Sequence, residues 1–78
     1  MIRLQQERQR RGWTQLDLGY HARIQPSEIS RIENGRLRPY PTQLSRLARA
    51  LGVIEPDVLL EEVAQLAEQN HQAEKQIA

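Results

Sequence analysis

The sequence predicts an all-α fold of five short helices, and three observations lead to this class. Apolar residues recur at helical spacing, capping residues precede several of these segments, and glycine or proline separates them. A chain of 78 residues has room for one small domain. Because the sequence shows no alternating strand pattern and no internal repeat, we expect a single helical unit.

The first predicted helix covers about residues 2–11 and ends at Gly12, because glycine favours the left-handed conformation that follows many helices. Its apolar face is narrow and consists of Ile2 and Leu4. We expect Trp13 to fold back onto the core after this helix.

The second predicted helix spans roughly residues 15–22. Thr14 can cap it, and Asp17 stands three residues later, where its carboxylate can accept from the backbone amide of the cap. Gly19 offers no side chain where two backbones approach closely. The inner face is predicted to consist of apolar residues at helical spacing, namely Leu16, Leu18 and Ala22.

The third predicted helix spans roughly residues 26–34. Gln25 takes the capping position, and Pro26 suits the first helical position because its φ is fixed and no amide is needed there. Gly35 supplies a left-handed residue that ends the helix.

Residues 14–34 are thus predicted to form two short helices joined by a tight turn. Outward polar side chains of the second helix can reach base edges in the major groove of DNA.

Prolines mark residues 36–41 as a loop, after which Thr42 is predicted to cap a fourth helix that ends at Gly52. The apolar face of this helix comprises Leu44, Leu47, Ala48 and Leu51. Pro56 lies at the first position of a fifth predicted helix, with acidic residues in its first turn.

The fifth helix is predicted to continue through residues 61–78 as a C-terminal extension. Apolar residues and one asparagine follow a heptad spacing there: Leu59, Val63, Leu66, Asn70, Ala73 and Ile77. Such a seam predicts dimerisation, above all through Leu59, Val63, Leu66 and Asn70. In the alternative, Leu59 and Val63 pack on their own domain and the chain continues as a polar tail.

Charge is divided unevenly along the chain. Residues 1–54 carry ten arginines against four carboxylates, a net charge of +6, whereas residues 55–78 carry one lysine against six carboxylates, a net charge of −5. A basic body attracts phosphates, and an acidic extension is held away from them. Because Arg31, Arg36 and Arg38 gather on the third helix and the following loop, a nucleic-acid surface is predicted there.

The composition argues against several classes of protein. The chain has no cysteine, which excludes disulfides and thiolate metal sites. It has no apolar run long enough for a signal peptide or a membrane span, so we expect a cytoplasmic, nucleoid-associated protein with no membrane partner. Since no nucleophile with a paired base, no phosphate-cradling glycine loop and no metal-ligand cluster is evident, we expect no enzyme, no metal and no cofactor.

Four motifs resemble those of one known family. They are Thr14-Gln15, the segment Ile-Ser-Arg-Ile-Glu-Asn-Gly at 29–35, Pro39, and the segment Leu-Ala-Arg-Ala-Leu-Gly-Val at 47–53. Together they resemble the lambda-repressor and Cro-like helix-turn-helix regulators, the XRE family, over about residues 4–60. The resemblance implies a five-helix lambda-repressor-like DNA-binding domain at residues 1–60, with the helix-turn-helix at 14–34 and the recognition helix at 26–34.

The resemblance also implies roles for individual residues. The base-reading positions are Gln25, Ser27, Glu28 and Arg31. The positions that contact the DNA backbone are Thr14, Gln15, Asn34, Arg36 and Arg38. Arg8 and Glu33 match an ion pair that ties the first helix to the third. Arg31 is the strongest candidate for reading guanine, because its planar guanidinium can donate to O6 and N7 together.

Two residues depart from the pattern of the family. Arg23 stands where relatives usually have glycine in a left-handed conformation, which implies strain or a differently shaped turn. Pro26 replaces a residue that often reads bases, so its neighbours are expected to carry more of the recognition.

The expected function is sequence-specific DNA binding by a bacterial or phage transcriptional regulator, a repressor or activator that acts as a homodimer on a palindromic operator. The alternative is an antitoxin or a restriction-modification controller, which binds its own promoter and a partner protein. The partners implied by these two hypotheses are double-stranded DNA, a second copy of the chain, and a toxin, an antirepressor or RNA polymerase.

Overall fold

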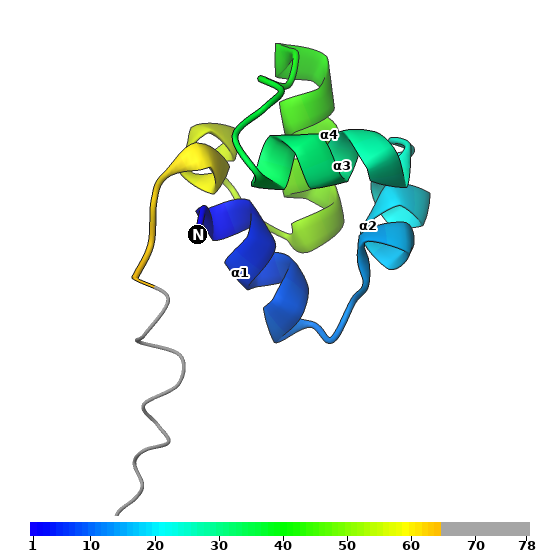
Figure 1. Ribbon diagram of the computed structural model, residues 1–78, viewed down its shortest axis with the longest axis horizontal. Helices are drawn as coiled ribbons and strands as arrows, with labels where there is room; N and C mark the ends of the chain where they lie inside the picture. The colour runs from blue at the N-terminus through cyan, green and yellow to red at the C-terminus, as the bar shows by residue number, and fades with distance from the viewer. Residues whose placement is uncertain (65–78) are drawn as a thin grey trace, which may run out of the picture.

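The computed structural model describes residues 1–64. This part of the chain holds four α-helices and one 3-10 helix: α1 (Arg3–Arg10), α2 (Gln15–Ala22), α3 (Pro26–Glu33), α4 (Pro41–Leu51) and η1 (Pro56–Leu60). Figure 1 shows α3 in front of α4, with α2 on one side and η1 on the other. The predicted all-α class is confirmed, and the described residues contain no strand beyond one isolated bridge.

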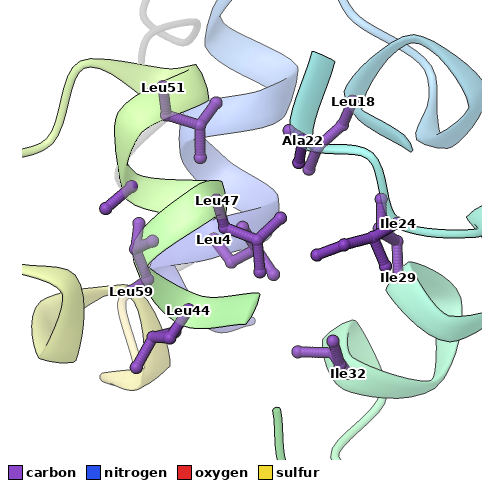
Figure 2. Packing of buried hydrophobic residues seen from close by; sticks show 11 residues of the cluster. Leu4, Leu18, Ala22, Ile24, Ile29, Ile32, Leu44, Leu47, Leu51 and Leu59 are labelled. Atoms are coloured by element: carbon purple, nitrogen blue, oxygen red, sulfur yellow. The ribbon is translucent and has the colours of Figure 1, made fainter. Parts of the chain in front are cut away.

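The hydrophobic core lies where the helices meet. Figure 2 shows Leu4 of α1 and Leu47 of α4 near its centre, with Ile29 of α3 facing them. The largest fully buried side chains are Leu4, Leu18, Ile29, Ile32, Leu47, Leu51 and Leu59. Because burial of one such side chain contributes about 1.5–3 kcal/mol, this set holds the helices in fixed relative positions.

Leu16 does not belong to this core, and its predicted place on the inner face of α2 is wrong. Its side chain is 68% exposed, whereas Leu18 is fully buried. Successive helical residues are about 100° apart, so two residues separated by two positions point to nearly opposite sides of the helix. The outer face of α2 therefore carries a large apolar side chain.

Each of the four α-helices is followed within two residues by a residue in the left-handed conformation. Glycine occupies this position after α1, α3 and α4, at Gly12, Gly35 and Gly52, with φ between 71° and 76°. After α2 the residue is Arg23, with φ 61° and ψ 46°. The family's turn shape is thus retained without its glycine, at a cost that a Cβ imposes in this conformation.

Capping explains where two of the helices begin. The Oγ1 atom of Thr14 accepts from the Asp17 amide at 3.0 Å, and an oxygen of the Asp17 carboxylate accepts from the Thr14 amide at 2.9 Å, which confirms the predicted capping box of α2. Thr42, in contrast, lies inside α4 and does not cap it. The helix begins at Pro41, because proline suits the first helical position and Gln43 accepts from the amide of the preceding Tyr40 at 2.9 Å.

The long fifth helix is not observed. Residues 56–60 form only the 3-10 helix η1, and residues 61–64 are not helical. Instead Ile2 and Glu62 form an antiparallel bridge, in which the Arg3 amide donates to the Glu61 carbonyl at 2.8 Å and the Val63 amide donates to the Met1 carbonyl at 2.8 Å. This pairing satisfies backbone groups that a helix would satisfy internally. The predicted helical extension is therefore wrong over residues 61–64.

This arrangement also changes the interpretation of the heptad seam. Leu59 is fully buried in the core of its own domain, which makes it unavailable to a second copy of the chain. Val63 lies in non-helical backbone. The other predicted seam positions, Leu66 and Asn70 among them, lie outside the described residues. Within residues 1–64, the structure follows the alternative in which Leu59 packs on its own domain.

Candidate nucleic-acid interface

The helix-turn-helix consists of α2 and α3, and a tight turn fixes the angle between them. A Cβ atom added at Gly19 would lie 2.5 Å from the carbonyl oxygen of Ile24, a distance that real side chains do not adopt. The Ile24 amide in turn donates to the Gly19 carbonyl at 3.0 Å. Close approach at Gly19 therefore sets the direction in which α3 leaves the turn.

The helix α3 has a buried side and an exposed side. Ile29, Ile32 and Glu33 are buried. The predicted DNA-facing residues that the structure leaves exposed on or beside α3 are Gln25, Ser27, Arg31 and Asn34. The polar side of this helix is thus exposed, while its apolar side is anchored in the core.

Glu28 differs from the other predicted base-reading residues. Its side chain is half-buried, and its Oε1 atom accepts from Nε2 of Gln43 at 3.5 Å. Gln43 also accepts from the Tyr40 amide, so it connects α3 to the start of α4. Gln43 is not among the residues predicted from the sequence, although a glutamine three residues after the N-terminal cap of a helix is a known capping signal.

A buried ion pair holds α3 against α1. The Nε atom of Arg8 donates to Oε2 of Glu33 at 2.7 Å, and its second nitrogen Nη2 donates to Oε1 at 3.1 Å. Arg8 also donates to the Trp13 carbonyl at 2.7 Å. Gln15 contributes a further hydrogen bond to Glu33 Oε1 at 3.0 Å. Glu33 thus accepts from α1 and α2 at once, and it orients α3 relative to both helices.

This network changes what Gln15 can offer to DNA. Its side-chain amide is engaged with Glu33, whereas the backbone amides in the first turn of α2 lack intrahelical acceptors, as at every helix start. Such amides, together with the positive end of the helix dipole, favour a phosphate. The phosphate contact implied for Gln15 is therefore best supported at its backbone amide.

The loop after α3 presents arginines in alternation with apolar residues. Arg36 and Arg38 are exposed, while Leu37 is half-buried and Pro39 is buried. The loop is also tied to the helix, since the Arg36 amide donates to the Arg31 carbonyl at 2.8 Å. Leu37 and Pro39 anchor the loop to the domain, and the side chains of the two arginines stay exposed.

Electrostatic pairing distinguishes these arginines from those of α1. Among residues 1–64, the ion pairs with N to O distances up to 4.0 Å use the Met1 ammonium and four arginines, namely Arg3, Arg8, Arg10 and Arg11. Arg31, Arg36 and Arg38 take part in none of these pairs. Their positive charge is uncompensated by carboxylates of the described chain, which favours an anionic ligand.

Other kinds of site are not evident in the described structure. Residues 1–64 contain no group of three or more histidine, aspartate or glutamate side chains that could hold a metal ion. A helix long and apolar enough to cross a membrane is also absent from this part of the chain.

Comparison with known proteins identifies the class to which this arrangement belongs. The profile of the helix-turn-helix domain family matches residues 2–63, so the chain belongs to this family, and its pattern is that of XRE-like members. Multiprotein-bridging factor 1 of Schizosaccharomyces pombe is 38% identical over 50 residues, which cover 64% of this chain and 34% of that protein. No solved structure matches the chain. Membership of the family indicates DNA binding.

Proposed function

We propose that this protein is a sequence-specific DNA-binding regulator of transcription. The observation that carries the proposal is the position of Arg31 on the exposed side of α3, with Arg36 and Arg38 exposed on the loop that follows. A helix of this kind fits the major groove, and arginines beside it that form no ion pair within residues 1–64 can neutralise phosphates.

Within the proposed complex, side chains divide into those that read bases and those that position the domain. Arg31 reads guanine, and Gln25 and Ser27 at the start of α3 contact neighbouring base edges. Glu28 accepts from cytosine N4 through Oε2, while Gln43 holds its other oxygen. The residues that contact the DNA backbone are Thr14, Gln15, Asn34, Arg36 and Arg38.

The proposed complex contains two copies of the chain on a palindromic operator. Two copies of α3 would then enter successive major grooves about 34 Å apart, which doubles the recognised sequence. Because Leu59 is buried in its own domain, the contact between the copies is formed by other residues. Repression would follow from blocking RNA polymerase, and activation from contacting it.

The test is a selection of bound duplexes from random DNA at physiological ionic strength, combined with a mass measurement of the resulting complex. We expect an enriched sequence with two-fold symmetry and a complex of two chains per duplex. No enrichment over random DNA would refute sequence-specific binding. An enriched but asymmetric site bound by one chain would refute only the dimer.

A second candidate function is a module that binds DNA and a partner protein together, as an antitoxin or a controller of a restriction system does. The name of the yeast relative, multiprotein-bridging factor, favours an assembly role of this kind. The chain spans about a third of that relative, so the partner cannot be carried over from it. Co-purification of a stoichiometric partner from the source cells supports this candidate.

A further inference from the structure

Three further arginines gather on a different part of the molecule. Arg23, Arg46 and Arg49 line a hollow of about 330 Å³ between the end of α2 and the side of α4. The remaining lining residues are His21, Ala22 and Ala50, so the hollow has no carboxylate in its wall. None of the three arginines belongs to an ion pair within residues 1–64.

A structural role accounts for only one of these arginines. Arg46 donates through Nε to the Ala22 carbonyl at 3.2 Å, where it satisfies an acceptor at the C-terminal end of α2. The side chains of Arg23 and Arg49 donate no hydrogen bond to any residue of the described chain. The guanidinium groups of Arg23 and Arg49 therefore line the hollow without an acceptor in the described chain, and Arg46 still has its Nη1 and Nη2 donors available.

Exposed apolar and aromatic side chains form a strip on α2 that is connected to this hollow through His21. Leu16 and Tyr20 lie one turn apart on the outer face of α2, and their side chains are 68% and 80% exposed. The Tyr20 ring meets the His21 ring edge-on, with 5.4 Å between the ring centroids. His21 stacks on Trp13 at 4.4 Å and also lines the hollow, so it joins the strip to the arginines.

We infer that this α2–α4 surface, made of Leu16, Tyr20, His21, Arg23, Arg46 and Arg49, docks a segment of a partner protein that combines carboxylates with apolar side chains. Guanidinium groups bind carboxylates in bidentate geometry, and the hollow supplies three of them in one place. Tyrosine and arginine are, with tryptophan, the residue types enriched among the side chains that carry most of the binding energy in protein interfaces.

The apolar strip favours a peptide over a second DNA contact. A phosphate backbone is hydrophilic and would leave Leu16 in water, whereas an acidic peptide with apolar residues can cover Leu16 while its carboxylates reach the hollow. The surface also shares no residue with the positions proposed to contact DNA. The inference therefore goes beyond the proposed function and does not depend on it.

The probe for this inference is a short blocked peptide of glutamates with two leucines one helical turn apart, titrated into the full chain by calorimetry. We expect binding that disappears when glutamine replaces every glutamate of the probe. Arg49→Glu is expected to weaken it about tenfold or more, because the variant loses charge-assisted hydrogen bonds and repels the carboxylates of the probe. Arg31→Ala, on the proposed DNA surface, is the matched control and should leave the affinity unchanged.

Arg23→Gly separates loss of binding from loss of folding. Glycine adopts the left-handed conformation without the steric cost of a Cβ atom, so the variant should unfold at a higher denaturant concentration. It should nevertheless bind the probe more weakly, because one guanidinium group is lost. Leu16→Ser should weaken binding of the leucine-containing probe, but not of a probe with serine in place of both leucines. The difference between these two probes tests whether the apolar strip contributes to peptide binding.

Three outcomes would overturn the inference. The first is no measurable heat with the glutamate probe, and the second is equal affinity for the glutamine probe. The third is displacement of the probe by an equimolar DNA duplex, which would assign the arginines of the hollow to DNA. Each outcome leaves selection of a DNA sequence by α3 unaffected, so failure here is distinct from failure of the proposed function.

Discussion

Arginines near the start of the chain and arginines further along it have opposite environments. Arg3, Arg10 and Arg11 surround the buried carboxylate of Glu7, with nitrogen to oxygen distances of 2.9–3.4 Å, and Arg8 is paired with Glu33. The other six have no ion-pair partner in the described part of the chain, and they are Arg23, Arg31, Arg36, Arg38, Arg46 and Arg49. All ten contribute equally to the net charge of residues 1–54.

The difference separates a structural use of charge from a use in binding. The N-terminal arginines form ion pairs within the fold. Arg8 links α1 to α3, and Arg11 donates to the Leu51 carbonyl at the end of α4. The later arginines form no ion pair within residues 1–64, and we propose that they bind ligands on two surfaces, the α3 face and the α2–α4 hollow. Net charge alone therefore overstates how much of this chain is available to phosphates.

The largest expected effect comes from breaking the buried pair of Arg8 and Glu33. Their side chains are 10% and 2% exposed, so Glu33→Ala leaves a buried guanidinium without its carboxylate. We expect a loss of about 3–5 kcal/mol in the free energy of unfolding, measured with urea. A double variant, Arg8→Met with Glu33→Leu, should recover most of this stability. A single-variant cost below about 1 kcal/mol would contradict a structural role for the pair.

The next effect concerns Glu7 and depends on pH. Burial by itself would raise the pKa of Glu7, but hydrogen bonds from Arg11 and Arg3 and the charge of Arg10 outweigh it and lower the pKa below the ordinary 4.5. Because the folded-state pKa is the lower one, this stabilisation is complete above the ordinary pKa and is lost as the pH falls through the folded value.

Glu7→Gln should remove this pH dependence. We expect a loss of about 1.5–3 kcal/mol at neutral pH, because several charge-assisted hydrogen bonds weaken together. Urea unfolding over a series of acidic pH values, with the natural chain as the reference, measures both quantities. A variant whose stability falls as steeply with acidification as that of the natural chain would show that Glu7 is not the group responsible.

A comparable effect on DNA binding is expected at Arg31. Arg31→Ala should reduce binding to the selected sequence by about 1–3 kcal/mol and relax one base position, whereas Arg38→Ala should weaken all sequences alike and lower the salt slope by about one. Arg10→Ala is the control from the paired group, since Arg10 lies 3.4 Å from Glu7. Equal losses for Arg31→Ala on selected and random duplexes would exclude base reading by Arg31.

The smallest expected effect tests the left-handed residue at the end of α2. Arg23→Gly should stabilise the fold by up to about 1 kcal/mol, because the cost of a Cβ at positive φ exceeds the entropy cost of glycine. Gly52→Ala is the opposite substitution at the end of α4, where φ is 71°, and it should lower the stability of the fold by a similar amount. Thermal unfolding of the two variants compares them directly, and a fall in melting temperature for Arg23→Gly would contradict strain at this residue.

Local signals predicted the helices well, because they act between residues close in sequence. Thr14 and Asp17 cap α2 as expected, Pro26 opens α3, and glycine ends three helices. The errors have local causes as well as distant ones. Leu16 was assigned to the wrong side of its helix by a pattern with too few apolar residues, and Thr42 was preferred to Pro41 as the start of α4.

The surfaces were less predictable, because they depend on which residues meet across the fold. A heptad pattern could not reveal that residues 61–63 pair with the start of the chain, since the bridge joins positions about 60 residues apart. Nor could the sequence show that Gln43 contacts Glu28, or that Arg23, Arg46 and Arg49 line the same hollow. The base-reading and phosphate positions came from family motifs, and they stay predictions.

By itself, the sequence determined an all-α helix-turn-helix chain with four α-helices close to their predicted limits, because capping and helical periodicity operate within one or two turns. The pairs of Arg3, Arg10 and Arg11 with Glu7 also lie within one helical turn. Only the tertiary structure decided that Glu33 neutralises Arg8 and that three later arginines line one hollow. Electrostatic interaction depends on distance in space, and the fold brings Arg8 to Glu33, and Arg23 and Arg49 to the same hollow, across separations that no local pattern records.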